Sequence, residues 1–538
     1  MKKMKYDYLG VMLDMSRNAV MSVEALKKYL EVLNKMGYNC AMLYTEDTYE
    51  VDGEPFFGYM RGRYTKEELR ELDDYAYGLG IELIPCIQTL AHLGSITRWN
   101  KIPMDSGPVL LIDNDRTYEF IDHAFSTVSS CFRTKKIHIG MDEAMMLGRG
   151  KHLDEHGFEK TSELMKRHLA KVCEIAAKYD FEPLMWSDMF FTMMGGWCRI
   201  PATTMPQYVK DALPSHVAPV YWDYYAGSEE GFAGMLYNHQ QISDKTWFAG
   251  GAWSWRGFLP NNKWSIHNMR MAMDACRKYK TKNIIMTMWG DDGGECSRYA
   301  TLSTLFFISE YVKGHDDMDK IRAKFKRMFG VEFEEFNNLD DANFLHKKDF
   351  KDWNQSCAKA YFFQDYFNGY LDANYNPENT PYLEECAKKL HATAKKSRKW
   401  AYMFDSAAKL CDVLAIKYSL GVKTREAYKN GDKAELMRLA KEEYTVVLRL
   451  INEFHRAFEK QWFTENKPSG FDVQDIRIGG LIKRTESCRR RLIDYASGKY
   501  NSIPELEEEL LSLVEPNGKL HTISNYNKYQ WQSTCNNI

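Results

Sequence analysis

Short apolar runs alternate with amphipathic stretches through about the first 315 residues of the chain. The runs are "YLGVMLDM" from Tyr8, "CAMLYTED" from Cys40, "IELIPCIQTL" from Ile81, "KIHIGMDE" from Lys136, "EPLMWSD" from Glu182, "APVYWDYY" from Ala218, "WFAGGAWSW" from Trp247 and "NIIMTMWGDD" from Asn283. Runs of this length are typical of short β-strands. The chain therefore predicts eight strands separated by helices.

The stretches between the runs have the periodicity of helices. From Ser22 to Met36, apolar residues recur three and four positions apart, as on one face of a helix. A second helix is predicted to begin at Thr65, because Glu68 completes a capping box and Gly80 provides a C-cap. Further helical patterns cover 117–130, 161–179, 265–280 and 299–312, whereas the pieces between 207 and 241 are less clear.

Eight strand–helix units in series predict an α/β fold, a (β/α)8 TIM barrel over residues 1–315. An open doubly wound sheet is the alternative, but no glycine-rich nucleotide loop follows the first strand. Residues 316–538 differ in character, with long stretches rich in Ala, Leu, Lys and Glu. They predict an all-α C-terminal domain without evident chemistry of its own.

Composition narrows the range of partners and compartments. The net charge of −2 gives no reason to expect a nucleic acid or an anionic membrane as partner. We find no signal peptide and no run of about 18 apolar residues that would span a membrane. The 12 cysteines form no CxxC pair and have no zinc spacing, which suits a reducing compartment. We therefore expect a soluble, cytoplasmic protein.

The predicted strands end in acidic and aromatic side chains, at the end of a barrel where active sites form. In chain order, the candidates are Arg17, Asp47, His92, Asp142, Glu143, Trp186, Trp222, Tyr224, Tyr225, Trp253, Trp255, Trp289, Asp291 and Glu295. Aromatic faces suit the apolar C–H faces of sugars, and carboxylates suit their hydroxyl groups. We interpret the set as a carbohydrate pocket, the alternative being core-capping rings and solvated acids.

A metal site is not expected at the fourth strand. His138 and Asp142 are four residues apart, and on a strand this separation is roughly 13 Å, too far for one ion. We expect neither a metal nor an organic cofactor.

Asp142 and Glu143 stand side by side at the end of the fourth run. Consecutive strand residues point to opposite faces, so both can serve one site only where the strand ends. Conventional glycosidases place two carboxylates on opposite sides of the bond, about 5 to 9 Å apart. Adjacent acids better suit a mechanism in which one protonates the leaving oxygen and the other orients a group of the substrate.

These residues resemble a known family. "HIGMDE" resembles the H-x-G-x-D-E signature of glycoside hydrolase family 20, the β-N-acetylhexosaminidases, and "MWGDD" resembles its WGE segment at strand eight. With "YWDYY", "GGAWSWRGF" and "WGDDGGE", the barrel is most similar to the intracellular bacterial branch that has a compact barrel and a helical C-terminal domain. The resemblance implies a retaining exo-β-N-acetylhexosaminidase that removes terminal GlcNAc, or GalNAc, from a small glycan or glycoconjugate.

The resemblance also implies roles for the candidates. The substrate's own 2-acetamido oxygen is the nucleophile, Glu143 is the general acid and then the base, and Asp142 holds the acetamido N–H. His92 supports the acid, with Asp47 behind it and Glu46 as the alternative. The sugar's hydroxyls and rings are expected to be bound by Arg17, Trp186, Trp222, Trp289, Asp291 and Glu295.

Two features depart from the family pattern. The family's tyrosine at strand seven is replaced by the tryptophans of "GGAWSWRG", so its role is expected to move to Tyr224 or Tyr225. Because the first predicted strand begins at Tyr8, we expect the α/β domain that precedes many family barrels to be absent.

Two other functions stay open at this point. One is a conventional two-carboxylate glycosidase acting on a sugar without the 2-acetamido group. The other is a non-catalytic carbohydrate-binding protein. For the helical domain we expect a packing role, with a homodimer interface or a rim to the pocket as alternatives.

Overall fold

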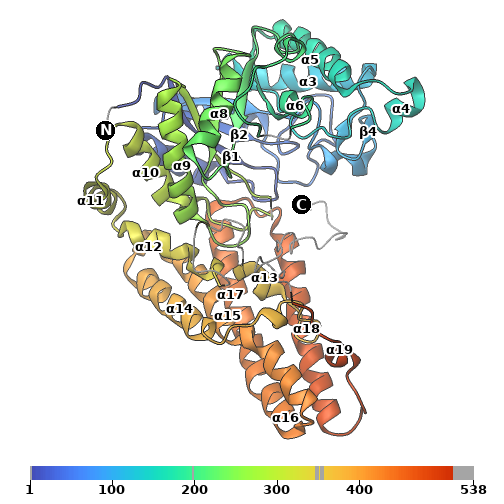
Figure 1. The fold of residues 1–538 in the computed structure, drawn as a ribbon, viewed down its shortest axis with the longest axis vertical. Helices are drawn as coiled ribbons and strands as arrows, with labels where there is room; N and C mark the ends of the chain where they lie inside the picture. Colours follow the sequence, from blue (N-terminus) through green and yellow to red (C-terminus); the bar gives the residue numbers. More distant parts are fainter. Residues whose placement is uncertain (1–2, 197–198, 292, 346–350, 352–356, 513–538) are drawn as a thin grey trace. The chain divides into compact units, whose positions relative to one another are not determined.

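The computed structural model describes residues 3–196, 199–291, 293–345, 351 and 357–512 (Figure 1). The chain divides into two compact units. The first comprises Met1–Trp253, Ser265–Gly290 and Thr304–Ile321, and the second comprises Ser254–Trp264, Asp291–Ser303 and Arg322–Ile538. Two segments that follow late barrel strands thus belong to the second unit. The domain boundary at residue 315 stays a prediction.

Eight parallel strands close into a barrel in the first unit. They are β1 (Tyr8–Asp14), β2 (Cys40–Tyr44), β3 (Glu82–Cys86), β6 (Lys136–His138), β7 (Glu182–Trp186), β8 (Ala218–Trp222), β9 (Trp247–Gly251) and β10 (Asn283–Met288). Around the barrel the order is β1-β10-β9-β8-β7-β6-β3-β2, and β1 pairs with β2 to close it. Each strand lies within one of the eight apolar runs, so the predicted TIM barrel is confirmed.

Helices follow the barrel strands, as the sequence pattern predicted. They are α1 (Val23–Met36), α2 (Lys66–Gly78), α3 (Asp115–Cys131), α4 (Lys151–His156), α5 (Thr161–Lys178), α6 (Asp188–Thr192), α7 (Gln207–Lys210), α8 (Glu229–Gln240), α9 (Asn262–Lys278) and α10 (Leu302–Val312). The capping box predicted at Thr65 is present, since Thr65 accepts from the Glu68 N–H and Glu68 from the Thr65 N–H. The connection after β3 adds a 3₁₀ helix, η1 (Gly94–Trp99), and the hairpin β4 (Met104–Ser106) and β5 (Val109–Leu110).

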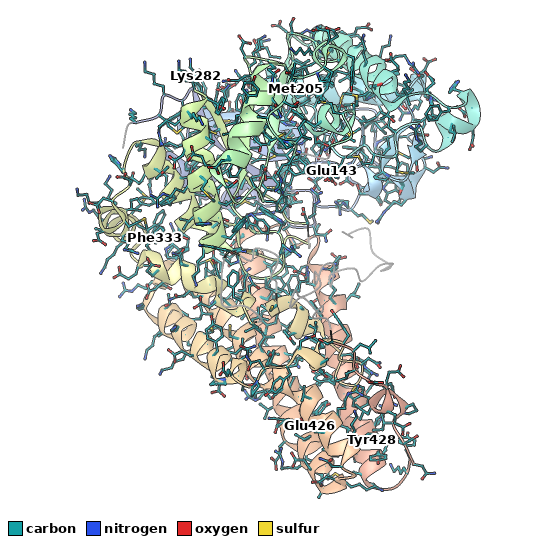
Figure 2. All side chains as sticks on the ribbon, viewed as in Figure 1. Glu143, Met205, Lys282, Phe333, Glu426 and Tyr428 are labelled. Carbon is teal, nitrogen blue, oxygen red and sulfur yellow. The ribbon has the colours of Figure 1, made fainter. Side chains whose placement is uncertain are left out.

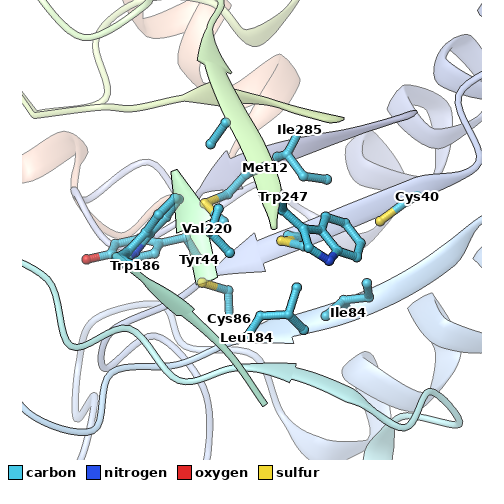
Figure 3. Close-up of a cluster of buried hydrophobic side chains, with 12 residues drawn as sticks. Met12, Cys40, Tyr44, Ile84, Cys86, Leu184, Trp186, Val220, Trp247 and Ile285 are labelled. Atoms are coloured by element: carbon cyan, nitrogen blue, oxygen red, sulfur yellow. The ribbon is translucent and has the colours of Figure 1, made fainter. Parts of the chain in front are cut away.

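Side chains from alternating strand positions fill the barrel (Figure 3). Trp247 and Cys40, which begin β9 and β2, lie toward one end, where Trp247 stacks on Tyr8 with 4.8 Å between the ring centroids. Tyr44 and Trp186, which end β2 and β7, lie at the other end, and both are buried. The barrel is therefore a packed core, and its upper layer is aromatic where the strands end.

The second unit is almost entirely helical, which confirms the predicted all-α C-terminal domain. Its helices are α11 (Met318–Phe329), α12 (Phe333–Asn337), α13 (Cys357–Phe363), α14 (Asn379–Lys396), α15 (Ala401–Lys429), α16 (Lys433–Lys441), α17 (Glu443–Glu465), α18 (Phe471–Ala496) and α19 (Pro504–Glu507), with 3₁₀ turns η2 (Arg298–Thr301), η3 (Asn338–Asn343), η4 (Asp372–Asn374) and η5 (Arg398–Trp400). The two inserted segments are part of its core: Phe258 packs against Phe454 and Phe458, and Glu465 accepts from the Arg298 N–H. Among the described residues, every helix is too short or too polar to cross a bilayer.

The chain leaves β6 through an unusual backbone. Gly140, Met141 and Glu143 have φ of 71°, 70° and 51°, the left-handed region that only glycine adopts freely. A side chain at Gly140 would force the Gln88 amide to move, because a Cβ there would lie 2.0 Å from Gln88 Oε1. The glycine lets the chain turn out of the strand while the Gln88 amide stays against it.

We predict that Gly140→Ala destabilises the barrel more than a left-handed backbone alone explains. The matched control is Gly80→Ala, since Gly80 has a φ of 72° but no atom near the position of a Cβ. The control should lose about 1–2 kcal/mol for the left-handed alanine. Gly140→Ala should lose about 1–3 kcal/mol more through overpacking. Equal midpoints of thermal unfolding for the two variants would contradict this account.

Candidate active site

One histidine nitrogen joins the two adjacent acids. His92 Nε2 lies 3.1 Å from Asp142 Oδ2 and 3.5 Å from Glu143 Oε2 (Figure 2 labels Glu143 on the barrel unit). His92 and Glu143 both have positive φ, 58° and 51°, so the backbone holds both residues in a conformation that costs energy. The three side chains predicted at the ends of the third and fourth barrel strands, β3 and β6, are therefore brought together.

Asp142 is held as a carboxylate. Its Oδ1 accepts a hydrogen bond of 2.8 Å from the Gln88 side-chain amide, whose oxygen accepts from the Met141 N–H at 3.2 Å. Burial alone would raise the pKa of Asp142, but the His92 charge and the hydrogen bonds outweigh it and lower the pKa to about 2. The same pairing raises the pKa of His92 to about 9, despite the opposing effect of burial. Near neutral pH the two form an ion pair.

Glu143 has the opposite tendency. Burial, followed by the negative charge of Asp142, raises its pKa, while His92 and Arg17 counteract the shift in part. Its side chain is 39% exposed, so a ligand can reach it. Glu143 is thus placed to hold a proton while its neighbour does not.

Asp188 connects Glu143 to the aromatic side of the site. Its Oδ2 accepts the Glu143 N–H at 2.9 Å, and its Oδ1 accepts the Trp222 indole N–H at 3.4 Å. Burial, and next the charge of Asp142, raises the pKa of Asp188 to about 7. This carboxyl fixes the left-handed backbone of Glu143 relative to the Trp222 ring.

Aromatic rings from the ends of five strands form one connected wall. Trp222 stacks on Tyr224 at 5.4 Å, and the Trp289 indole N–H donates to the Tyr224 hydroxyl at 2.8 Å. The wall continues from Tyr224 through Tyr225 to Trp253 and, on the other side, from Trp289 to Tyr44 and Trp186. These aromatic side chains therefore form one set of touching rings, and the pocket they are expected to line stays a prediction. Trp186 and Trp253 are almost fully buried and support the wall from behind.

Arg17 lies where the barrel closes. Its guanidinium donates to Asp14 Oδ2 at 3.1 Å and lies 3.3 Å from Glu46 Oε1. It also stands over the Tyr44 and Trp289 rings, 5.3 and 5.8 Å from their centroids. Asp14 in turn accepts the Gly290 N–H at 2.9 Å, which ties the end of β1 to the end of β10. Arg17 is only 17% exposed and is fixed in direction by its partners.

The structure shows a different partner for Asp47 from the predicted His92. Asp47 is buried and receives hydrogen bonds from the Arg61 guanidinium, at 3.1 Å from Nη2, so its charge is already neutralised elsewhere. The alternative, Glu46, is the residue before Asp47, and its charge adds to that of Asp142 in raising the pKa of His92. The backbone explains the exchange: Glu46 has a φ of 43°, which turns the chain as it leaves β2.

Three further candidates belong to the second unit. Glu295 is fully buried there and forms ion pairs with Lys359 (2.7 Å) and Arg477 (3.2 Å). Its carboxylate therefore has a structural role, and the expected contact with the sugar was wrong. Trp255 and Asp291 lie in the segments Ser254–Trp264 and Asp291–Ser303. Their expected contacts with the sugar stay predictions.

Sequence reasoning missed Gln88 as a site residue, and it placed Asp188 at the end of the fifth strand without giving it a role. Both follow their strands by two residues, in "CIQT" and "MWSD", so the rule that barrel strands end at the site could have found them. Among the described residues, no group of three or more His, Cys, Asp or Glu side chains is placed to hold a metal ion.

Comparison with known proteins identifies both parts of the chain. Residues 6–209 match the family model "Glycosyl hydrolase family 20, catalytic domain", and residues 332–525 match "Glycoside Hydrolase 20C C-terminal domain". Human hexosaminidase D is 23% identical over 223 residues, 39% of this chain and 43% of that protein. The Emericella nidulans beta-hexosaminidase is 28% identical over 168 residues, 26% of this chain and 27% of that one. The matches thus span less than half of these curated relatives.

Solved structures of related proteins are also similar to this chain. The Flavobacterium johnsoniae chitobiase is 17% identical, with a TM-score of 0.47, over 93% of this chain and 74% of that one.

The His92–Asp142 pair gives a stability term with a defined pH window. Folding raises the pKa of His92 from its ordinary value of about 6.5 to about 9. The stability that this protonated histidine adds to the folded state is complete below pH 6.5 and is lost as pH rises through 9. Asp142, with its pKa lowered to about 2, contributes only above about pH 4. The pair therefore stabilises the barrel most between about pH 4 and 6.5.

We predict that His92→Gln lowers the midpoint of thermal unfolding more at pH 6 than at pH 9.5. His216→Gln, at an exposed position, is the control and should show the same small change at both pH values. A gap between wild type and His92→Gln that does not depend on pH would show that the ion pair is absent.

Proposed function

We propose that this glycoside hydrolase of the β-hexosaminidase family is a retaining exo-β-N-acetylhexosaminidase. The chain carries a family 20 glycosyl hydrolase catalytic domain followed by a glycoside hydrolase 20C C-terminal domain. It removes terminal, non-reducing β-linked GlcNAc, or GalNAc, from a small glycan or glycoconjugate. The 2-acetamido group of that sugar is the nucleophile. We further propose the cytoplasm as its location, and a homodimer and a bacterial origin remain predictions.

The observation that carries this proposal is the single histidine nitrogen near both carboxylates. A conventional pair of catalytic carboxylates flanks the scissile bond from opposite faces. Here Asp142 and Glu143 each lie within 3.5 Å of His92 Nε2, so they stand together on one side. This layout leaves the opposite face of the sugar without a carboxylate from this pair, and it suits a nucleophile supplied by the substrate.

The protonation states support a division of labour between the acids. Glu143, with its raised pKa, donates a proton to the leaving oxygen as the acetamido oxygen attacks the anomeric carbon. Asp142, kept ionised, accepts the acetamido N–H and stabilises the positive charge of the oxazolinium intermediate. Glu143, now a carboxylate, then takes a proton from the water that opens this ring. Two inversions at one carbon give retention of configuration.

The remaining residues bind and orient the sugar. Trp222, Tyr224 and Trp289 offer connected aromatic faces to its C–H surface. Tyr224 accepts a hydrogen bond from the Trp289 indole N–H, and we expect its hydroxyl to take the family tyrosine's role toward the acetamido oxygen. Arg17, oriented by Asp14 and Glu46, binds hydroxyls at the non-reducing end.

The loss of kcat on replacing the general acid should be larger for a leaving group that must be protonated to depart. We predict that Glu143→Gln lowers kcat on a disaccharide, whose sugar alkoxide is a poor leaving group, by about 10²–10⁴-fold. On 4-nitrophenyl N-acetyl-β-glucosaminide the loss should be much smaller, because nitrophenolate leaves without protonation. The measurement is steady-state hydrolysis of the two substrates.

The matched control is Glu67→Gln, a 75% exposed glutamate on α2, which should behave as wild type. Wild-type turnover of the disaccharide by Glu143→Gln would remove Glu143 as the acid. A wild-type protein that hydrolyses neither substrate would refute the proposed function itself.

A further inference from the structure

Three large aromatic side chains, two exposed and one half-buried (Trp99), form a cluster at the surface of the barrel unit, apart from the wall described above. The ring centroids of Phe56, Tyr59 and Trp99 lie 5.5–6.0 Å from one another, so each ring touches the other two. Phe56 is 40% and Tyr59 39% exposed, unlike the buried rings of the barrel core. We call these three residues the aromatic platform. Contiguous exposed aromatic surface is unusual and marks a binding site.

Both segments that carry the aromatic platform start at the active site. Phe56 and Tyr59 follow β2 and Glu46, while Trp99 ends the 3₁₀ helix η1, which begins two residues after His92. Six residues of 3₁₀ helix advance about 12 Å, so Trp99 lies one short helix away from the histidine that contacts both acids. The platform and the acids therefore share one end of the barrel.

The segment after β2 is also held rigidly. Arg61 donates to Asp47 and to the Ser16 carbonyl, which fastens the segment to the ends of β2 and β1. A Cβ at Gly58 would lie 1.9 Å from the Asp47 carbonyl oxygen, so the backbones are in close contact there. Such anchoring orders the aromatic platform before any ligand binds, and this reduces the entropy lost on binding.

The position of the acid decides which part of a substrate reaches the aromatic platform. Glu143 protonates the leaving oxygen, so the leaving group emerges beside Glu143 and its neighbour His92. β6, whose end Glu143 follows by five residues, pairs with β3, and β3 pairs with β2. The two segments of the platform follow β2 and β3. By contrast, Trp222 ends β8, and Arg17 and Trp289 follow β1 and β10.

We propose that the aromatic platform binds the sugar residues on the leaving side of the scissile bond, a site additional to the pocket for the terminal sugar. This proposal rests on the proposed function and specifies which substrates it favours: oligosaccharides over glycosides with a small leaving group. A hollow of ≈ 300 Å³ lies beside the platform, lined by Phe56 and Trp99 together with Glu54, Lys101 and Arg116. Aromatic faces with polar groups at their edge match the C–H faces and hydroxyls of a pyranose.

The test compares two leaving groups in the full-length enzyme. The substrates are methyl N-acetyl-β-glucosaminide, which has no sugar on the leaving side, and the β-linked tri-N-acetylchitotriose. The variant is Phe56→Ala with Trp99→Ala. We expect kcat/KM for the trisaccharide to fall about tenfold, mainly through KM, and kcat/KM for the methyl glycoside to stay within twofold of wild type.

The control variant is Tyr237→Ala, which removes a similarly exposed ring (44%) from α8 and should change neither substrate. Thermal midpoints and sedimentation are measured for all variants. The proposal would be overturned by equal losses on both substrates or by no loss on the trisaccharide. A changed oligomeric state without a selective loss would also overturn it, because that result would identify the aromatic platform as a self-association surface. No turnover of either substrate by the wild type would instead refute the proposed function.

Discussion

The site depends on the ion pair between His92 and Asp142. Two adjacent acids in one partly buried pocket would repel each other and share a proton without preference. His92 Nε2 lies closer to Asp142 than to Glu143, and Gln88 adds a hydrogen bond to Asp142 alone. The charge is therefore fixed on Asp142 and the proton is favoured on Glu143. Every catalytic role in the proposed mechanism follows from this asymmetry.

The backbone makes this arrangement possible. A regular strand would point Asp142 and Glu143 to opposite faces. Left-handed residues after β6 break that alternation, and Gly140 leaves room for the Gln88 amide that contacts Asp142. Asp188 then holds the Glu143 N–H and the Trp222 indole at once. The strain of this turn is thus held in place by buried polar contacts, as is common at functional sites.

The barrel was predictable because eight apolar runs and the helices between them repeat one simple pattern, and each run contains a strand. The identity of the acids was predictable as well, since strand ends meet at one face. The pairing of side chains was not: Asp47 and Glu46 are neighbours, and only the turn at Glu46 and the distant Arg61 decide which one acts on His92. Glu295 follows the last strand, yet Lys359 and Arg477, more than 60 residues away in the chain, bury it in the helical unit. Such contacts between distant residues leave no local pattern in the sequence.

The central claim is that the substrate's acetamido oxygen, oriented by Asp142, replaces a carboxylate nucleophile. The most direct measurement is inhibition by a thiazoline analogue of N-acetylglucosamine, which has the shape of the bicyclic oxazolinium intermediate. The account predicts tight competitive inhibition that weakens strongly in Asp142→Ala, because that variant lacks the carboxylate facing the ring nitrogen. An active enzyme on which the thiazoline has no effect would contradict substrate assistance and favour a conventional two-carboxylate mechanism.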